Sequence, residues 1–346
     1  MCHQGMTVAS HAMTIRQSRV LGAMLGLHAG DSLGATLEFD THEEIKAKYP
    51  DGLQDIIGGG TFDWPAGHAT DDTDMARAVM LAYRERTGPE DDVARRAAEW
   101  FLRWKQGIDW PDRQPGSTPK DIGLATAVGL DRYAETRDPD QAGAGVNQAG
   151  NGSLMRCLAT GLWQGDAEKR RHESIRISAV THNDARCTVS CAVYNAMVAR
   201  LVSLPAKTSA SEAATVALVE AEAEAERLEA DSPTKPVLRA LGQGMQLSVE
   251  ELARNGPQKG SLPGKARGYV LETLALAVAA LRDERPLRDV LVDVVRVGGD
   301  TDTNAAVAGG LLGARDGHEA IPEAWSEKLQ FGSEFRQLML DMVSED

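Results

Sequence analysis

The sequence is poor in cysteine and in aromatic residues. Among its 346 residues only 4 are cysteines and 5% are aromatic. These cysteines (Cys2, Cys157, Cys187 and Cys191) are too few and too scattered for a disulfide scaffold, and no Cys-x-x-Cys pair is present to hold a structural zinc ion. With so few aromatic residues, we expect the hydrophobic core to consist mainly of Ala, Leu and Val.

Basic charge is also in deficit, with 37 Lys and Arg against 51 Asp and Glu and a net charge of −14. Proteins that bind nucleic acids or anionic membranes rely on Lys and Arg, so we expect neither a nucleic-acid nor a membrane partner. No apolar run approaches the roughly 18 residues that a transmembrane helix needs, and the N-terminus has no secretory signal. We therefore predict a cytoplasmic protein, expected to be monomeric.

Apolar residues recur at helical spacing through most of the chain, which predicts an all-α fold in a single compact multi-helix domain. Helices are expected over residues 16–28, 74–86, 91–105, 122–135, 173–202, 213–230 and 304–314, and residues 269–282 are apolar. The Ala- and Glu-rich stretch 213–230 is expected to be a solvated outer helix, and the small residues of 304–314 favour very close packing. Residues 287–297 are the best strand candidate.

Two acidic clusters stand out, TDDTD at residues 70–74 and GGDTDTN at residues 298–304. Each precedes a predicted helix, where Asp and Thr commonly cap the N-terminus. One cap needs only one such residue, however, and adjacent carboxylates repel one another. Carboxylate and hydroxyl oxygens are ligands for hard cations such as Mg²⁺ or Mn²⁺. Capping would explain either cluster alone, whereas the two together predict a metal site.

Other acidic motifs fit less well. An EF-hand starting at Asp300 would need Gly and Glu where the sequence has Ala305 and Leu311. An aspartyl-nucleophile phosphatase would place Asp-x-Asp after an apolar strand, and residues 290–297 followed by Asp300 and Asp302 approach that pattern. The match is partial, because Asn304 occupies the last position of the phosphatase pattern. An aspartyl-nucleophile phosphatase is therefore the alternative function.

Two more glycine-containing stretches carry polar residues, GDSLGATLE at residues 30–38 and GNGSLMR at residues 150–156. Glycines beside Asn151 would let the backbone approach a ligand, although an ordinary tight turn has the same pattern. His182 stands in a helical pattern and is on its own more typical of a structural histidine.

In order, the motifs GDSLGATLE, TDDT, GNGSLMR and GGDTDTNAAVAGGLLGA resemble the ADP-ribosylglycohydrolase family, the group that contains the dinitrogenase-reductase-activating glycohydrolase. The resemblance runs from about residue 21 to residue 313. It implies a helical domain of the ADP-ribosylglycohydrolase type over residues 16–346, with a variable helical elaboration at about 204–264. Residues 1–15 would be an N-terminal extension, either disordered or covering the site.

The resemblance implies a hydrolase that cleaves the C1″ glycosidic bond of an ADP-ribosylated protein and releases ADP-ribose, with two Mg²⁺ or Mn²⁺ ions as cofactors. Thr70, Asp71 and Asp72 would bind one ion. Asp300 and Thr303 would bind the other, with Asp302 bridging both. Glu38 matches the acidic residue beside the metals, and Glu38, Asp71 and Asp302 are the candidate catalytic residues there.

Substrate contacts follow from the same resemblance. The ribose and diphosphate would lie against Asn147, Gly150, Asn151, Gly152, Ser153 and His182. Asp121 lies where arginine-specific members place an Asp, so it is a further candidate catalytic residue that would hold the departing guanidinium. An N-cap for the helix at 122–135 is an equal interpretation of Asp121. Arginine-linked substrates are favoured, and serine-linked or small-molecule substrates stay open, as does an inactive ADP-ribose-binding protein.

Overall fold

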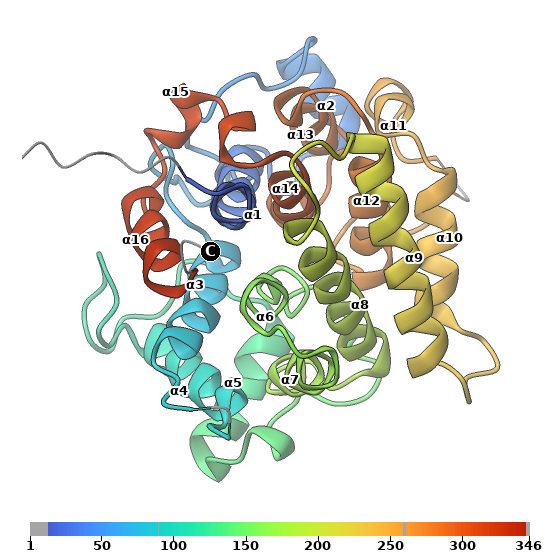
Figure 1. Ribbon diagram of the computed structural model, residues 1–346. Helices are drawn as coiled ribbons and strands as arrows, with labels where there is room; N and C mark the ends of the chain where they lie inside the picture. Colours follow the sequence, from blue (N-terminus) through green and yellow to red (C-terminus); the bar gives the residue numbers. More distant parts are fainter. Residues whose placement is uncertain (1–12, 89, 259–260, 344–346) are drawn as a thin grey trace, which may run out of the picture.

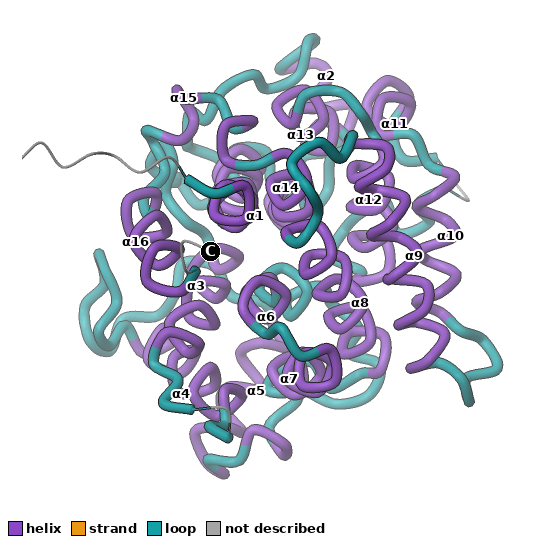
Figure 2. Tube along the Cα trace, viewed as in Figure 1, coloured by secondary structure: helices purple, strands orange, loops and turns teal. Residues whose placement is uncertain are grey.

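Helices are the only extended regular elements in the residues that the computed structural model describes, 13–88, 90–258 and 261–343. Figure 2 shows these helices joined by loops, so the predicted all-α fold is confirmed. The α-helices are α1 (Ile15–Gly34), α2 (His42–Lys48), α3 (Asp71–Arg84), α4 (Val93–Gln106), α5 (Leu124–Thr136), α6 (Leu158–Trp163), α7 (Ala167–Ala179), α8 (Ala185–Val202), α9 (Ala210–Leu228), α10 (Pro236–Gln246), α11 (Val249–Asn255), α12 (Val270–Arg282), α13 (Leu287–Arg296), α14 (Thr301–Asp316), α15 (Glu323–Ser326) and α16 (Gly332–Met342). Two 3₁₀ turns span Pro139–Gln141 and His318–Ala320.

Helices α1 and α14 lie side by side at the centre of the molecule and run antiparallel (Figure 1). Glycines at every fourth position of α1 face α14, and they are Gly22, Gly26, Gly30 and Gly34. A Cβ atom at Gly30 would lie 2.1 Å from the carbonyl oxygen of Ala305, so the two backbones touch. The close packing predicted for residues 304–314 is thus confirmed. It brings the C-terminal end of α1 against the N-terminal end of α14.

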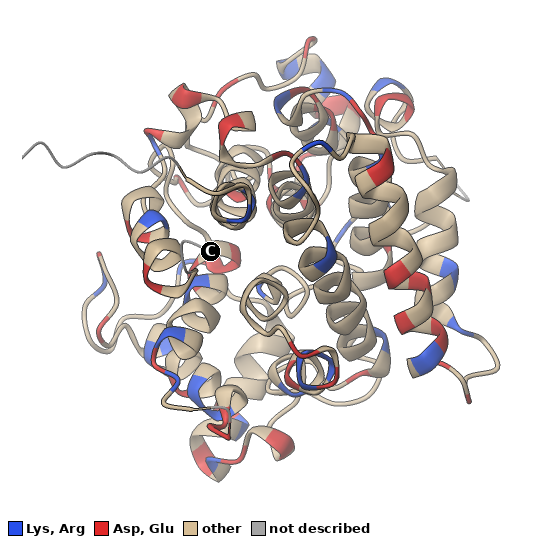
Figure 3. Cartoon of the chain, viewed as in Figure 1, with Lys and Arg blue, Asp and Glu red and all other residues tan. Residues whose placement is uncertain are grey.

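The other helices surround this pair. Helices α12 and α13 pack on α14, α3 and α16 pack on α1, and α8 contacts both central helices. Helix α9 lies outside α8 (Figure 1), with its alanines at 213, 217, 221 and 225 buried and acidic residues along its outer side (Figure 3). This is the solvated outer helix that the sequence predicts. No helix in the described part of the chain is long and apolar enough to cross a membrane.

Two predictions about elements are wrong. Residues 287–297 form helix α13 rather than a strand, because Leu287, Val290, Leu291, Val294 and Val295 recur at helical spacing and bury one face. Packing of that face on α14 outweighs the strand preference of valine. The helix expected over 173–202 is two helices.

The break lies at residues 180–184, between α7 and α8. The side chain of Asp184 accepts a hydrogen bond from the backbone N–H of Arg186 at 2.9 Å and so starts α8. Apart from α13, seven of the described helices were not predicted from the sequence, most of them short: α2, α6, α10, α11, α12, α15 and α16.

Only some of the expected domain boundaries fall on residues that the structure describes. Residues 1–12 of the expected N-terminal extension lie outside the described residues, and Thr14 belongs to the domain because its hydroxyl accepts from Gln17 N at 3.2 Å and caps α1. The segment 204–264 contains α9, α10 and α11, which pack on the side of α8, α12 and α13.

Candidate functional site

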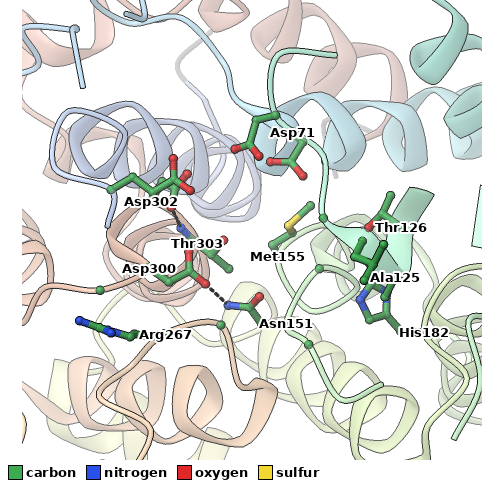
Figure 4. A pocket seen from close by; sticks show the side chains of 18 of the residues that line it. Asp71, Ala125, Thr126, Asn151, Met155, His182, Arg267, Asp300, Asp302 and Thr303 are labelled. Atoms are coloured by element: carbon green, nitrogen blue, oxygen red, sulfur yellow. Dashed lines mark hydrogen bonds between the residues drawn. The ribbon is translucent and has the colours of Figure 1, made fainter. Parts of the chain in front are cut away.

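The clustered polar residues meet at a cavity of about 510 Å³. Ten of the predicted site residues line it: Glu38, Asp71, Asp121, Gly150, Asn151, Gly152, His182, Asp300, Asp302 and Thr303. Figure 4 shows Asp300, Asp302 and Thr303 on one side of this cavity, Asp71 beyond them and His182 at the opposite side. The four motifs, which are separated by up to 270 residues in sequence, therefore build one site.

The first acidic cluster lies at the start of α3, and only one of its side chains caps that helix. Thr70 Oγ1 accepts a hydrogen bond from Asp72 N at 3.3 Å. Asp72 is completely buried and receives a hydrogen bond from Thr303 Oγ1 at 3.1 Å, which joins α3 to α14. Capping therefore accounts for Thr70 and leaves the carboxylates of Asp71 and Asp72 free for another role.

The second acidic cluster begins α14 without capping it. Asp300 occupies the N-cap position, yet its side chain makes no cap hydrogen bond. Instead, its Oδ2 atom accepts from Asn151 Nδ2 at 2.7 Å, the contact drawn in Figure 4. Gly299 has φ +85, and its carbonyl oxygen accepts from Phe39 N at 2.8 Å. That left-handed turn brings Glu38 beside Asp300.

Two groups of three carboxylates result. Asp31, Asp72 and Asp302 form one, and Glu38, Asp300 and Asp302 form the other, with the candidate ligand oxygens of each group within 4.8 Å of one another. Asp302 belongs to both. Asp31 Oδ1 and Glu38 Oε2 are buried without a hydrogen-bond partner. Clustered, unsatisfied carboxylate oxygens fit hard divalent cations.

Burial and repulsion from neighbouring carboxylates act together on three aspartates of this site. They raise the pKa of Asp71, Asp72 and Asp302 well above the ordinary value for an aspartate. Burial, with the nearby carboxylates of Asp121 and Asp300, raises the pKa of Glu38 to about 9. A cation bound among these oxygens would favour their ionised forms and offset the repulsion.

The loop after Ala149 forms another wall. Its Gly152 lies so close to His182 that an added Cβ would be 3.0 Å from the imidazole Cε1 atom. Arg156 is fully buried, donates to the Gly152 carbonyl at 3.0 Å and stacks on Phe101, so it holds the loop from behind. Burial lowers the pKa of His182 to about 3, which keeps this histidine neutral.

Four predicted residues do not line the cavity. Thr70 and Asp72 are buried behind it, and Ser153 is buried beneath the loop, where it accepts from Ser178 Oγ at 2.8 Å. Asn147 is exposed, with its backbone N–H bonded to Asp184. The N-cap interpretation of Asp121 is wrong, because Gly123 is the N-cap residue of α5 and no side chain caps that helix. Asp121 instead lines the cavity.

Sequence reasoning missed Asp31 as a member of the cluster. It lies within the GDSLGATLE motif, and its Oδ2 accepts from the backbone N–H groups of Thr70 and Thr73 at 3.1 and 3.2 Å. The available signal was a lone acid in a glycine-rich helix, directly after one of the glycines that face α14. Met155, which lies within the GNGSLMR motif, also lines the cavity, as do Thr126 and Arg267, which sequence reasoning did not single out.

Comparison with known proteins finds relatives that match most of the chain. The ADP-ribosylarginine hydrolase Tri1 of Pseudomonas putida (strain GB-1) is 26% identical over 333 residues, covering 94% of this chain and 77% of that protein. The ADP-ribosyl-[dinitrogen reductase] glycohydrolase of Rhodospirillum rubrum is 28% identical over 322 residues, covering 90% of each. The ADP-ribosylhydrolase ARH3 of Gallus gallus is 25% identical, covering 93% of this chain and 91% of that protein.

A solved structure described as an ADP-ribosylglycohydrolase-related protein complex superposes with a TM-score of 0.72 at 27% identity, covering 94% of this chain and 97% of the solved chain. The sequence model of the ADP-ribosylglycohydrolase family matches residues 12–346. With nearly the whole chain matched, and with the acidic motifs gathered at one cavity, the chain belongs to the ADP-ribosylglycohydrolase family.

Proposed function

We propose that the chain is a hydrolase, dependent on two Mg²⁺ or Mn²⁺ ions, that releases ADP-ribose from ADP-ribosylated protein side chains, arginine-linked ones in particular. The observation that carries this proposal is the pair of carboxylate groups sharing Asp302 at the edge of the 510 Å³ cavity. Thr70, Asp71 and Asp72 would hold one ion, Asp300 and Thr303 the other, with Asp302 common to both, and Asp31 and Glu38 adjoin them.

When bound, divalent cations supply Lewis-acid character for ribose hydroxyls and for a water molecule. The chain itself positions the sugar: the loop of Gly150, Asn151 and Gly152 lines the cavity with backbone that a ligand can approach. Asn151 is held by Thr273 and Asp300, since its Nδ2 atom lies 3.0 and 2.7 Å from their oxygens. His182, neutral and buried, supports Gly152.

In the proposed reaction water adds to C1″ while the bond from C1″ to the guanidino nitrogen breaks. The water proton is accepted at a carboxylate oxygen, for which Glu38 would serve in its ionised form, since it lines the cavity and its Oε2 atom has no hydrogen-bond partner. The departing guanidino group takes up a proton and leaves as guanidinium, whose charge Asp121 would hold. ADP-ribose and an unmodified arginine are the products.

The phosphatase alternative lacks its structural premise, because residues 287–296 before Asp300 form a helix instead of a strand. A protein that only binds ADP-ribose would release none, so a measurement of ADP-ribose release distinguishes this alternative from the hydrolase. The relatives include proteins named ADP-ribosylarginine hydrolase and others named ADP-ribosylhydrolase ARH3, so the acceptor residue is decided by assay.

The test measures ADP-ribose release from matched peptides carrying ADP-ribosyl-arginine or ADP-ribosyl-serine, with Mg²⁺, with Mn²⁺ and with a chelator. We expect release from the arginine peptide only with a divalent cation, and loss of release in Asp302→Ala. Asp289→Ala, an exposed change on α13, is the matched control. Binding of ADP-ribose without release from either peptide would contradict the proposal.

A further inference from the structure

A second cavity of about 400 Å³ adjoins the first. Asp71 and Asp121 line both cavities, so they stand at the junction. The second cavity lies between α3 and the loops of residues 64–68 and 110–121, and the proposed function leaves it without a role. Its lining includes Trp64, Trp104, Trp110 and Asp74. Asp74 is also the one carboxylate of the first acidic cluster to which the proposed metal site gives no role.

We propose that this second cavity binds the acceptor arginine of the substrate, with the guanidinium at the junction and the methylene stem along the tryptophan walls. This inference rests on the proposed hydrolase function and adds the site that selects the acceptor. The scissile bond joins ribose to the acceptor side chain. Ribose in the first cavity therefore places the acceptor across the junction, in the second.

The walls of the second cavity match a planar cation. Guanidinium groups stack on aromatic rings and pair with carboxylates through two parallel hydrogen bonds. Trp64 and Trp110 are 8% and 5% exposed and supply flat rings. Each ring is already contacted from this chain: His68 stacks on Trp64, and the Arg77 guanidinium lies 4.6 Å from the ring centroid of Trp110. The Asp74 carboxylate is fixed by a hydrogen bond from Trp104 Nε1 at 2.9 Å, so it meets a ligand with its geometry already set.

The charges around this cavity favour a cationic occupant. The charged residues that line it are Asp71, Asp74, Asp112, Asp121, Arg113 and Lys120. Arg113 is engaged with backbone carbonyls, among them that of Ser117 at 2.6 Å. The exposed Lys120 places its ammonium 5.1 Å from the ring centroid of Trp64, so the indole face already accepts a cation from this chain. A substrate cation would replace it there.

A serine acceptor would use little of this cavity. Its side chain is short, carries no charge and would make no contact with Asp74 or with the tryptophan rings. The second cavity would thus favour an arginine acceptor over a serine acceptor, because only the arginine side chain is long enough to fill it.

The experiment measures binding of blocked amino acids to the full chain with Mg²⁺ and ADP-ribose present, by titration calorimetry. The probes are Nα-acetyl-L-arginine amide and, as the non-planar cation, Nα-acetyl-L-lysine amide. We expect arginine to bind more tightly, and Trp64→Leu and Asp74→Asn each to weaken it about tenfold. Trp163→Leu is the matched control, since Trp163 has a buried, unpartnered indole N–H as Trp64 does but lines neither cavity.

Lys120→Gln provides a change in the opposite direction. Removing the competing cation from the face of Trp64 should tighten arginine binding about two- to fivefold. Equal affinities for arginine and lysine, or arginine binding untouched by both Trp64→Leu and Asp74→Asn in folded protein, would overturn the inference. Selective arginine binding without any ADP-ribose release would leave the second cavity standing and contradict the proposed function instead.

Discussion

At the scale of single residues, the site is built from acids that repel one another. Asp302 is 2% exposed, and burial with the carboxylates of Glu38 and Asp72 raises its pKa well above the ordinary value. Such an arrangement costs stability in the fold and is compensated when a cation binds. Removing one of these carboxylates should therefore stabilise the metal-free protein and weaken metal binding.

Asp302→Asn is expected to raise the unfolding free energy of the metal-free protein by about 1–3 kcal/mol, because folding no longer has to bury this carboxylate among other acids or to protonate it. The same change should abolish the stabilisation that Mg²⁺ gives the wild type. Thermal unfolding with a chelator and with Mg²⁺ checks both parts. A variant less stable than wild type in chelator would show that the repulsion is absent.

Asp121 should act on the departing group. Asp121→Asn is expected to lower kcat/KM for arginine-linked substrate about 10- to 100-fold, the value of one hydrogen bond to a charged group. Any activity on serine-linked peptide should change less, because that leaving group carries no charge. Asp131→Asn, whose side chain is largely exposed on α5, is the control. A parallel loss on both peptides would assign Asp121 to the metal site.

At the scale of elements, the contact between α1 and α14 positions the metal-binding side chains. Gly30→Ala would place a methyl group 2.1 Å from the carbonyl oxygen of Ala305, so the helices must separate. We expect a loss of about 3 kcal/mol or more in unfolding free energy, and weaker Mg²⁺ binding because Asp31 moves from Asp302. Denaturant unfolding and metal titration measure the two effects.

Gly242→Ala in α10 is the matched control for Gly30→Ala. A Cβ atom there meets nothing within 4 Å, so the same change should stabilise by about 0.5–1 kcal/mol through helix propensity. If both variants behaved alike, close packing of α1 on α14 would not explain the glycines.

At the scale of the whole molecule, pH and metal binding both change the folding stability through the protonation of the same buried acids. The folded, metal-free protein holds protons that the unfolded chain releases near pH 4, because the pKa of Asp31 is raised to about 6 and that of Glu38 to about 9. Folding is then linked to proton uptake, so stability falls as pH rises through these values.

We expect the melting temperature in chelator to fall between about pH 7.5 and about pH 9, beyond the range in which histidines titrate. The increase produced by Mg²⁺ should be larger at the higher pH, since cation binding expels the same protons. Thermal scans at both values, with and without Mg²⁺, measure this. A Mg²⁺ effect independent of pH would mean that the acids are already ionised.

The net charge of −14 combines acidic residues from two different environments, the surface and the buried site. Many acidic residues lie on outer helices such as α9 (Figure 3), where water solvates them. Asp31, Asp72 and Asp302 are buried instead. The total therefore describes the surface that a partner protein meets and says little about the cavity.

Much of this protein is determined by its sequence. The all-α class follows from helical periodicity, and eight of the ten predicted cavity-lining residues lie in the four motifs, which stand in short uninterrupted runs. Local patterns report local structure because helix formation and capping depend on neighbours within four residues. The same dependence misled for α13, where valine content suggested a strand and one-sided burial decided for a helix.

Only the tertiary structure decided which acids share a site. Asp31 joins Asp72 and Asp302 because four glycines of α1 allow contact with α14, a relation between segments some 270 residues apart. The second cavity is likewise made by loops whose residues show no pattern of their own. Helical periodicity and capping depend on interactions between neighbours in the chain, so they can be predicted from the sequence. The composition of a site depends on which distant segments the packed core brings together.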